Sequence, residues 1–286
     1  MKNFLLAAFL FMTPIVVFAT KKSLSEAIKD NSIKMVAVNT EGLYEGKTTK
    51  LTITNNTKSV LQITVDLGTI LKPEDPTCQP MILSGEEMLA VLPHAQGEVT
   101  VQTFCGNAPK HCPSKDLTYS FDHVAGDTLV KVLRFIKTNS LFDYLGQQAV
   151  WAITNNHELS NVYDPARDVV SKQLIELIST ITGRAKPAYY TLVPDEQNPG
   201  SPAYNPKVLK ILAQFEARLE APKTLTLGVF DAAGIMIQPV FENQNFPARG
   251  HRFEVEFEAE NVAAGQYYIR LKEGNAVLQE KMVKVE

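Results

Sequence analysis

The sequence lacks the motifs on which most recognisable enzyme chemistry depends. Among 286 residues it contains three cysteines, five histidines and one tryptophan. There is no Gly-x-Ser-x-Gly, no His-Glu-x-x-His and no Gly-rich phosphate-binding loop, which are signatures of serine hydrolases, zinc proteases and nucleotide-binding enzymes. The net charge is −3 and no basic segment stands out, so nucleic acid is not an expected partner. We therefore expect a protein that is not an enzyme and has no cofactor and no metal site, although a small hydrolase without a recognisable motif stays open.

Long apolar runs are equally scarce. Only the segment from Phe4 to Phe18 is almost continuously apolar; it follows Lys2, is interrupted by Pro14, and leads to Ala19. This pattern is typical of a secretory signal peptide and too short for a comfortable membrane span, although an N-terminal anchor is the alternative. We expect a signal peptide over residues 1–19, a mature chain from near Thr20 with no transmembrane segment, and an exported protein at the outer cell surface or outside the cell.

The three cysteines would then lie in an oxidising compartment. An odd count allows at most one internal bridge among Cys78, Cys105 and Cys112. Cys105 and Cys112 share one short loop and are the candidate disulfide, but Cys78 could pair with either of them. His111 and His123 add zinc-ligand types, yet the spacing fits no known finger or ribbon, so we interpret them as surface histidines.

Residues 20–124 carry short runs of alternating apolar and polar residues separated by turn clusters. The clearest runs are 50–54, 60–67, 88–92 and 98–104. The first two flank the turn residues 55–58, which predicts a hairpin. The pattern predicts an antiparallel β domain of the sandwich type.

The apolar period changes to helical spacing at Ala125. One helix is predicted from Asp127 as its N-cap, a second from Tyr144 to Asn155, and a third from Asp164-Pro165 to Gly183. Residues 125–183 therefore form a small three-helix unit.

Five prolines then fall between residues 187 and 206, which predicts a linker over residues 184–206. Alternation resumes beyond it, for example at Arg252–Glu258, and predicts some seven strands. The expected fold class is α+β, with an N-terminal antiparallel β domain, a small three-helix unit, a Pro-rich linker and a C-terminal immunoglobulin-like β-sandwich over residues 207–286.

Four short segments of residues 207–286 share a pattern with a known family. They are Val229–Gly234, Ala248–His251, Ala264–Leu271 and Lys281–Lys284. In order and spacing they resemble the C-terminal sorting domain of proteins exported by the type IX secretion system of Gram-negative bacteria. The motif residues are Asp231, Gly234, Gly250, Gly265, Tyr267, Lys281 and Lys284. The usual Pro-Asn-Pro opening is missing here, with Tyr204-Asn205-Pro206 in its place.

The resemblance implies a compact sandwich that the outer-membrane secretion machinery recognises. Such domains are commonly removed afterwards, and the mature protein is attached to surface polysaccharide or released. The same residues also suit any sandwich, because Gly234 and Gly274 fit turns and Tyr267 covers the core with an amphipathic ring. A plain immunoglobulin-like module therefore stays an alternative.

A second motif surrounds the single tryptophan. Gly146-Gln147-Gln148-Ala149-Val150-Trp151 resembles the Gln-x-Ala-hydrophobic-Trp motif of thioester domains in bacterial surface adhesins. The resemblance implies a covalent bond between the Gln147 side chain and an upstream cysteine thiolate, here Cys105, with Cys112 second. Gly146 stands where that family has threonine. The alternative is an ordinary helix in which Trp151 anchors the core and Gln147 lies on the exposed face.

These observations predict an exported, non-enzymatic surface or secreted protein. Its C-terminal domain would engage the secretion machinery, and its N-terminal region would have a structural role or bind a surface polysaccharide or a protein. A thioester adhesin that uses Cys105 and Gln147 is the alternative function.

Overall fold

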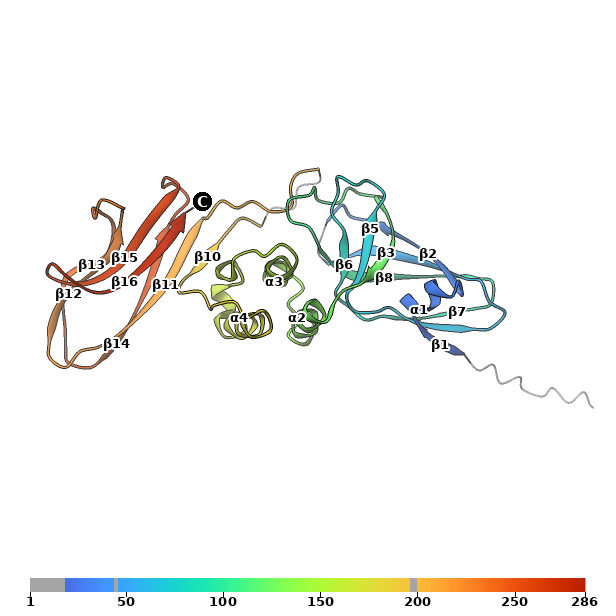
Figure 1. Cartoon of the computed structure of the whole chain (residues 1–286), viewed down its shortest axis with the longest axis horizontal. Helices are drawn as coiled ribbons and strands as arrows, with labels where there is room; N and C mark the ends of the chain where they lie inside the picture. The colour runs from blue at the N-terminus through green and yellow to red at the C-terminus, as the bar shows by residue number, and fades with distance from the viewer. Residues whose placement is uncertain (1–18, 44–45, 196–199, 286) are drawn as a thin grey trace, which may run out of the picture.

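The structure is a computed structural model that describes residues 19–43, 46–195 and 200–285 (Figure 1). Most of the predicted signal peptide, residues 1–18, lies outside this range. Strands hold 44% of the chain and helices 19%, in several sheets and a few helices, which is consistent with the α+β class. Among the described residues, no helix is both long and apolar enough to cross a membrane.

The N-terminal strands form a closed antiparallel barrel with a small sheet beside it. The barrel strands, in spatial order, are β2 (Ile33–Asn39), β3 (Gly46–Asn55), β8 (Gln96–Cys105), β6 (Met81–Leu83), β5 (Thr69–Pro73) and β9 (Thr118–Val124). The small sheet contains β1 (Thr20–Ser23), β4 (Leu61–Thr64) and β7 (Met88–Val91), and β1 is parallel to β4. Both share one apolar core, which includes Ile53 and Ile63. This arrangement, a closed barrel with a parallel pair beside it, differs from the predicted antiparallel sandwich.

The predicted hairpin between residues 50–54 and 60–67 is wrong. β3 pairs with β2 and β8, whereas β4 pairs with β1 and β7. The buried Asn55 side chain donates to the backbone oxygens of Ser59, Val91 and Leu92 at 2.8–3.1 Å. These bonds hold the turn after β3 against the end of β7, so the chain leaves the barrel for the small sheet.

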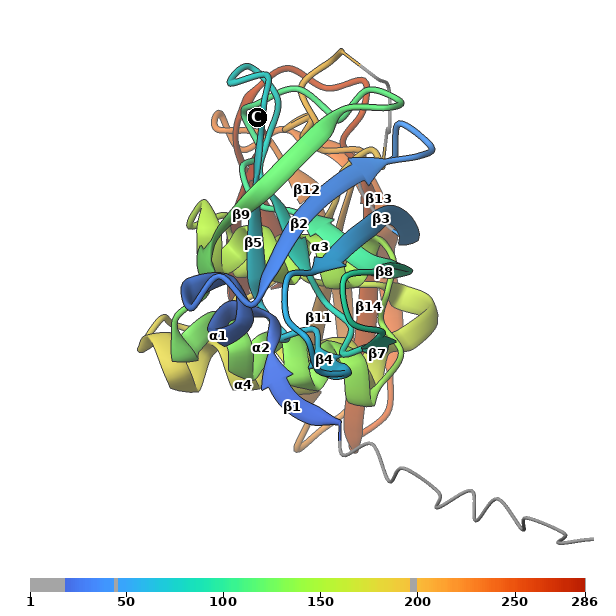
Figure 2. The same ribbon diagram turned by 90° about the vertical axis from the view of Figure 1, so that its right-hand side faces the viewer.

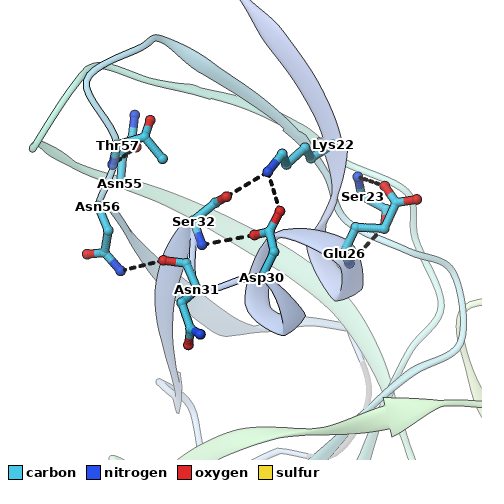
Figure 3. Close-up of polar contacts among 9 residues, drawn as sticks. All are labelled: Lys22, Ser23, Glu26, Asp30, Asn31, Ser32, Asn55, Asn56 and Thr57. Atoms are coloured by element: carbon cyan, nitrogen blue, oxygen red, sulfur yellow. Dashed lines mark hydrogen bonds and ion pairs between the residues drawn. The ribbon is translucent and has the colours of Figure 1, made fainter.

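The sequence analysis missed a short helix, α1 (Leu24–Lys29), between β1 and β2. Ser23 and Glu26 form a capping box at its start (Figure 3). At its end the Asp30 carboxylate contacts the Lys22 ammonium and accepts from the Ser32 backbone N–H. These contacts lower the pKa of Asp30 to about 2. The strand that begins at Thr20 is thus fixed to the body of the barrel.

Three longer helices follow close to their predicted places. They are α2 (Asp127–Thr138), α3 (Tyr144–Thr154) and α4 (Asp168–Thr182), with single 3-10 turns η1 (Leu159–Asn161) and η2 (Pro165–Arg167) before α4. The N-cap of α2 is Gly126 rather than Asp127, and Gly183 ends α4 in the left-handed conformation at φ 72°. The apolar faces of the helices pack with Phe104 of β8 in a second core.

The C-terminal strands form two sheets around a third core. One sheet has the order β10 (Tyr190–Leu192), β11 (Lys210–Arg218) and β14 (Gly250–Glu258). The other has the order β13 (Met236–Phe246), β12 (Lys223–Phe230), β15 (Gly265–Glu273) and β16 (Ala276–Val285). Phe215, Leu227, Phe257 and Ile269 come from both sheets into this core. Helices α2, α3 and α4 lie between this part and the barrel (Figure 1), and Figure 2 shows the molecule from the barrel side.

The segment predicted as a linker contains a strand and contacts both β regions. β10 pairs with β11, and the chain then crosses to the barrel before it returns to β11 (Figure 1). At the barrel the Cys112 N–H donates to the Ser201 oxygen at 2.8 Å, and the Ala203 N–H donates to the Lys110 oxygen at 3.2 Å. Proline density therefore signals an extended path here, but one that hydrogen bonds fix in place.

Candidate functional site

The residues of the sorting-domain resemblance lie at several places on the two C-terminal sheets and do not form one cluster. Asp231 and Gly234 make the turn between β12 and β13, where the Asp231 side chain accepts from the Ile235 N–H at 2.8 Å. Gly234 has a φ of 83°, which glycine adopts without strain. These two residues have a clear structural purpose.

Tyr267 and Lys281 hold neighbouring segments against the third core. The Tyr267 ring packs 5.5 Å from that of Phe257, and its hydroxyl donates to the Ala263 oxygen at 2.7 Å. Lys281 donates to the Ala188 oxygen at 2.8 Å, and burial lowers the pKa of its ammonium group. Both side chains therefore stabilise the fold directly.

The remaining motif residues lie on the surface. Gly265 begins β15 and Lys284 lies near the end of β16, both exposed. Gly250 begins β14, has no heavy atom within 4 Å of where a Cβ would stand, and does not have a positive φ. The fold of this chain thus gives no reason for a glycine at position 250.

The two residues of the thioester resemblance lie together. The Gln147 side chain accepts from the Cys105 N–H at 2.9 Å and donates to the Cys105 oxygen at 3.0 Å. Gln147 is 1% exposed and Cys105 is fully buried. The expectation that Gln147 lies on the exposed face is therefore wrong, because α3 packs against the end of β8 on one side and the helical core on the other. Trp151 is buried in the barrel core, as the alternative interpretation predicted.

Gly146 allows this close approach. A Cβ at position 146 would overlap the Leu141 carbonyl oxygen and come within 2.7 Å of the Phe104 ring. The threonine that thioester domains carry at this position would not fit between α3 and β8. The departure from the family pattern thus has a steric cause in this fold.

The structure has no disulfide among Cys78, Cys105 and Cys112, which are all buried. Cys78 lies beside the loop of the other two, with its Sγ 3.8 Å from the Cys112 oxygen. Burial, together with the Asp75 carboxylate, raises the pKa of the Cys78 thiol. A thiol kept protonated in this way is a poor nucleophile.

No cluster of three or more potential metal ligands occurs in the described part of the chain. His111 pairs by its backbone with Cys78, whereas His123 is exposed on β9 and contacts Asp122 at 3.0 Å. The cysteines and histidines that the sequence suggested as ligand types are thus divided between two places.

Sequence reasoning missed an aromatic cluster that extends from the barrel core to the junction of the helices with the C-terminal sheets. The His157 ring lies 4.2 Å from the Tyr204 ring and 5.8 Å from the Trp151 ring. Arg184 reaches the cluster from the end of α4 and donates to the His157 backbone oxygen at 2.6 Å. The only sign of this site in the sequence is the turn-forming pair Asn155-Asn156 before His157. Tyr204 is far from these residues in the sequence, so their contact could not be predicted.

A cavity of about 490 Å³ opens beside this cluster. Its walls come from the residues after α3, from β10, from the segment before β11 and from β16. Polar residues of η1 and β10 line it, including Ser160, Asn161 and Thr191. The residues after α3, the segment between β10 and β11 and the C-terminal sheets meet here, so we take this cavity and the α3 motif as the candidate functional site.

The stability of the protein is expected to depend on His157. Burial and the Arg184 charge lower its pKa from the ordinary value of 6.5, and its Nδ1 is buried without a hydrogen-bond partner among the described residues. The unfolded chain then binds the proton more readily than the folded chain. The stabilisation is present above pH 6.5 and is lost as the pH falls through this range towards the folded-state pKa.

Thermal unfolding followed between about pH 8 and pH 5 checks this expectation. His157→Gln should flatten the slope of melting temperature against pH below pH 6.5. His94→Gln, at an exposed position on the loop before β8, is the matched control and should keep the wild-type slope. An unchanged slope in His157→Gln would contradict the assignment.

Comparison with known proteins adds little to this geometry. No protein-family model matches the chain, and a search of curated proteins finds no match. Among solved structures, a selenomethionine-labelled β-glucosidase from Kluyveromyces marxianus aligns with 83% of this chain at 10% identity, with a TM-score of 0.20. The chain spans 44% of that protein's length. A match with a score this low carries no argument about this chain.

Proposed function

We propose that this chain is an exported, non-enzymatic surface or secreted protein whose C-terminal region is read by an outer-membrane secretion machinery. Its barrel and helices would form the structural or ligand-binding part. On this proposal the finer layout is an N-terminal β domain, a helical unit and a C-terminal immunoglobulin-like sandwich. The secretory pattern of residues 1–19 and the resemblance of residues 207–286 to type IX sorting domains motivate it.

One observation carries the proposal. Gly250 belongs to the sorting-domain motif, yet a Cβ there would have no heavy atom within 4 Å and the backbone φ is not positive. By contrast, a Cβ at Gly228, outside the motif residues, would come within 2.6 Å of the Met236 sulfur. A glycine without a folding role on an exposed strand end is what recognition by another protein predicts.

The proposed sorting region should include β10. Six strands lie within the described residues 207–285, and β10 completes the smaller sheet from the segment before them. Lys281 bonds to the Ala188 oxygen, so β16 also contacts this segment. On this proposal the functional unit would begin near Tyr189, ahead of the predicted boundary at residue 207.

A localisation experiment tests the proposal. The full-length protein should reach the cell surface or medium, and a chain truncated before residue 207 should stay in the periplasm. Truncation before residue 207 leaves β10 without its partner β11. A second truncation, before residue 189, removes β10 as well and controls for this unpaired strand. Export of either truncated chain at the level of the full-length protein would contradict the proposal.

Gly250→Ala separates recognition from folding in the same assay. We expect it to lower export while the melting temperature of the purified protein stays within about 1 °C, because most surface changes alter stability by less than 0.5 kcal/mol. Gly228→Ala should instead lower the melting temperature. Normal export of Gly250→Ala would show that Gly250 is not part of the recognition surface.

A thioester adhesin is the second candidate, favoured by the contact between Gln147 and Cys105. Attack of the Cys105 thiol sulfur on the Gln147 carboxamide carbon would form the thioester, and the amide nitrogen would leave as ammonia. Against it, both residues are at most 1% exposed, so an external nucleophile could not reach the bond without movement of α3. The intact mass decides: a mature protein lighter by one ammonia, with the deficit lost in Gln147→Ala, supports the thioester, and an unmodified mass excludes it.

A further inference from the structure

The cavity at the junction has a buried polar floor. Ser160, Asn161 and Thr191 are 8%, 7% and 4% exposed and all line it. The Thr191 hydroxyl lies within hydrogen-bond distance of the Asn161 side-chain oxygen and of the Ser160 hydroxyl, and Asn161 donates to the Tyr204 hydroxyl at 3.0 Å. Buried polar groups cost free energy unless they are bonded, so this floor is an ordered hydrogen-bonding surface rather than a packing defect.

The polar floor can also form further hydrogen bonds. A primary amide has two N–H groups and a carbonyl oxygen. Asn161 gives one N–H to Tyr204 and accepts from Thr191, which leaves its second N–H without a partner among the described residues. The hydroxyls beside it can both donate and accept. Such a surface suits a ligand that also carries groups able to do both.

Aromatic rings and a further amide form the rim. Tyr189, Tyr204 and His157 line the cavity, and Tyr204 and His157 are held against one another. Asn156 lines it from an exposed position with φ 54°, a left-handed conformation that asparagine tolerates. Rings offer flat apolar surface, and the amide adds polar contacts at the mouth.

The charges around the cavity balance. Among the described residues that line it, Glu158 carries the one carboxylate and Lys284 the one ammonium group. Neither sign dominates, so the lining does not select a strongly charged ligand. Hydroxyls, amides and tyrosine rings in a cavity of this size match an uncharged molecule with many hydroxyls and an apolar ring face.

From these features we infer that the cavity is a binding site for a neutral saccharide of one or two rings, such as the end or a repeat of a surface glycan. Ring hydroxyls bond to Asn161, Ser160 and Asn156, and a ring face packs on a rim tyrosine. The inference deepens the proposed function by naming the ligand class, and it rests on that function for its biological setting. Binding itself requires only the folded protein.

Titration calorimetry of the purified full-length mature protein with cellobiose, maltose and N,N′-diacetylchitobiose tests the inference. At least one disaccharide should bind at millimolar concentration or below, and added salt should change its affinity by less than about twofold because no ion pair forms. Asn156→Gly should weaken binding about tenfold, the equivalent of one hydrogen bond of about 1.4 kcal/mol. Glycine accepts the positive φ at this position, so the variant should fold normally.

Asn243→Gly is the matched control. Asn243 is another exposed asparagine with a positive φ, 47°, but it lies on β13 and does not line the cavity. This variant should keep the wild-type affinity. Absence of binding to every disaccharide at millimolar concentration, or equal affinities of the two variants, would overturn the inference. Saccharide binding by a protein that fails the export test would leave this inference standing and reject the proposed function alone.

Discussion

Gly146→Ala is expected to destabilise the protein strongly, by about 3 kcal/mol or more. Overpacking of a well-filled core typically costs 1–3 kcal/mol, and the clash here includes backbone, which cannot rotate away. A Cβ at this position would overlap the Leu141 carbonyl oxygen and approach the Phe104 ring to 2.7 Å. Thermal and urea unfolding of the purified variant measure the loss.

Gly250→Ala is the control for this prediction, since the same added methyl group meets nothing within 4 Å. It should unfold at nearly the wild-type temperature. If the two variants were equally stable, α3 could not lie against β8 as described, and the contact between Gln147 and Cys105 would be in doubt with it.

Gln147→Met should be the second large effect. Methionine keeps the approximate volume of the side chain but removes both hydrogen bonds to Cys105. The Cys105 N–H and carbonyl oxygen would each lose a buried hydrogen bond, at a cost of about 1–3 kcal/mol each. Urea unfolding should show a loss of at least about 2 kcal/mol, the lower end of the two costs together.

The neighbouring glutamine supplies the matched control. Gln148 is equally buried, but its side-chain oxygen has no hydrogen-bond partner among the described residues. Gln148→Met removes an unsatisfied polar group, so stability should be unchanged or higher. Equal losses in the two variants would show that α3 is sensitive to any substitution rather than to these two bonds.

The sequence predicted the elements of this fold better than their partners. The helical period of Leu129, Val132 and Ile136 located α2, and Gly183 marked the end of α4. Alternation likewise located most strands, but it describes only the strand itself and not the strand that lies beside it. The failed pairing of β3 with β4 follows from this, because two of the Asn55 side-chain bonds that separate them reach Val91 and Leu92, which are far from Asn55 in the sequence.

For the candidate site, too, the sequence predicted some of the residues but not how they are arranged. The resemblance around Trp151 brought Cys105 and Gln147 to attention, and they are in contact. The sequence did not predict the burial of Gln147, because a helix enclosed on both sides does not have the one-sided apolar pattern of a surface helix. The cavity was invisible in sequence because Asn161, Thr191 and Lys284 meet only through the three-dimensional fold.

The pairing of β10 with β11 determines whether proteolytic cleavage near β10 would separate the two parts of the protein. β10 pairs with β11 over three residues, and the Tyr190 ring stacks on that of Tyr163 at 3.9 Å. A single cut after β10 would leave this strand on the N-terminal fragment while it still pairs with β11 of the other fragment at the edge of the sheet. A cut ahead of Tyr189 would keep both C-terminal sheets complete in one fragment, but the bonds of Ser201 and Ala203 would still hold that fragment to the barrel. A single cut on either side of β10 would therefore not release this part by itself, and the protein would keep it as a non-covalent subunit.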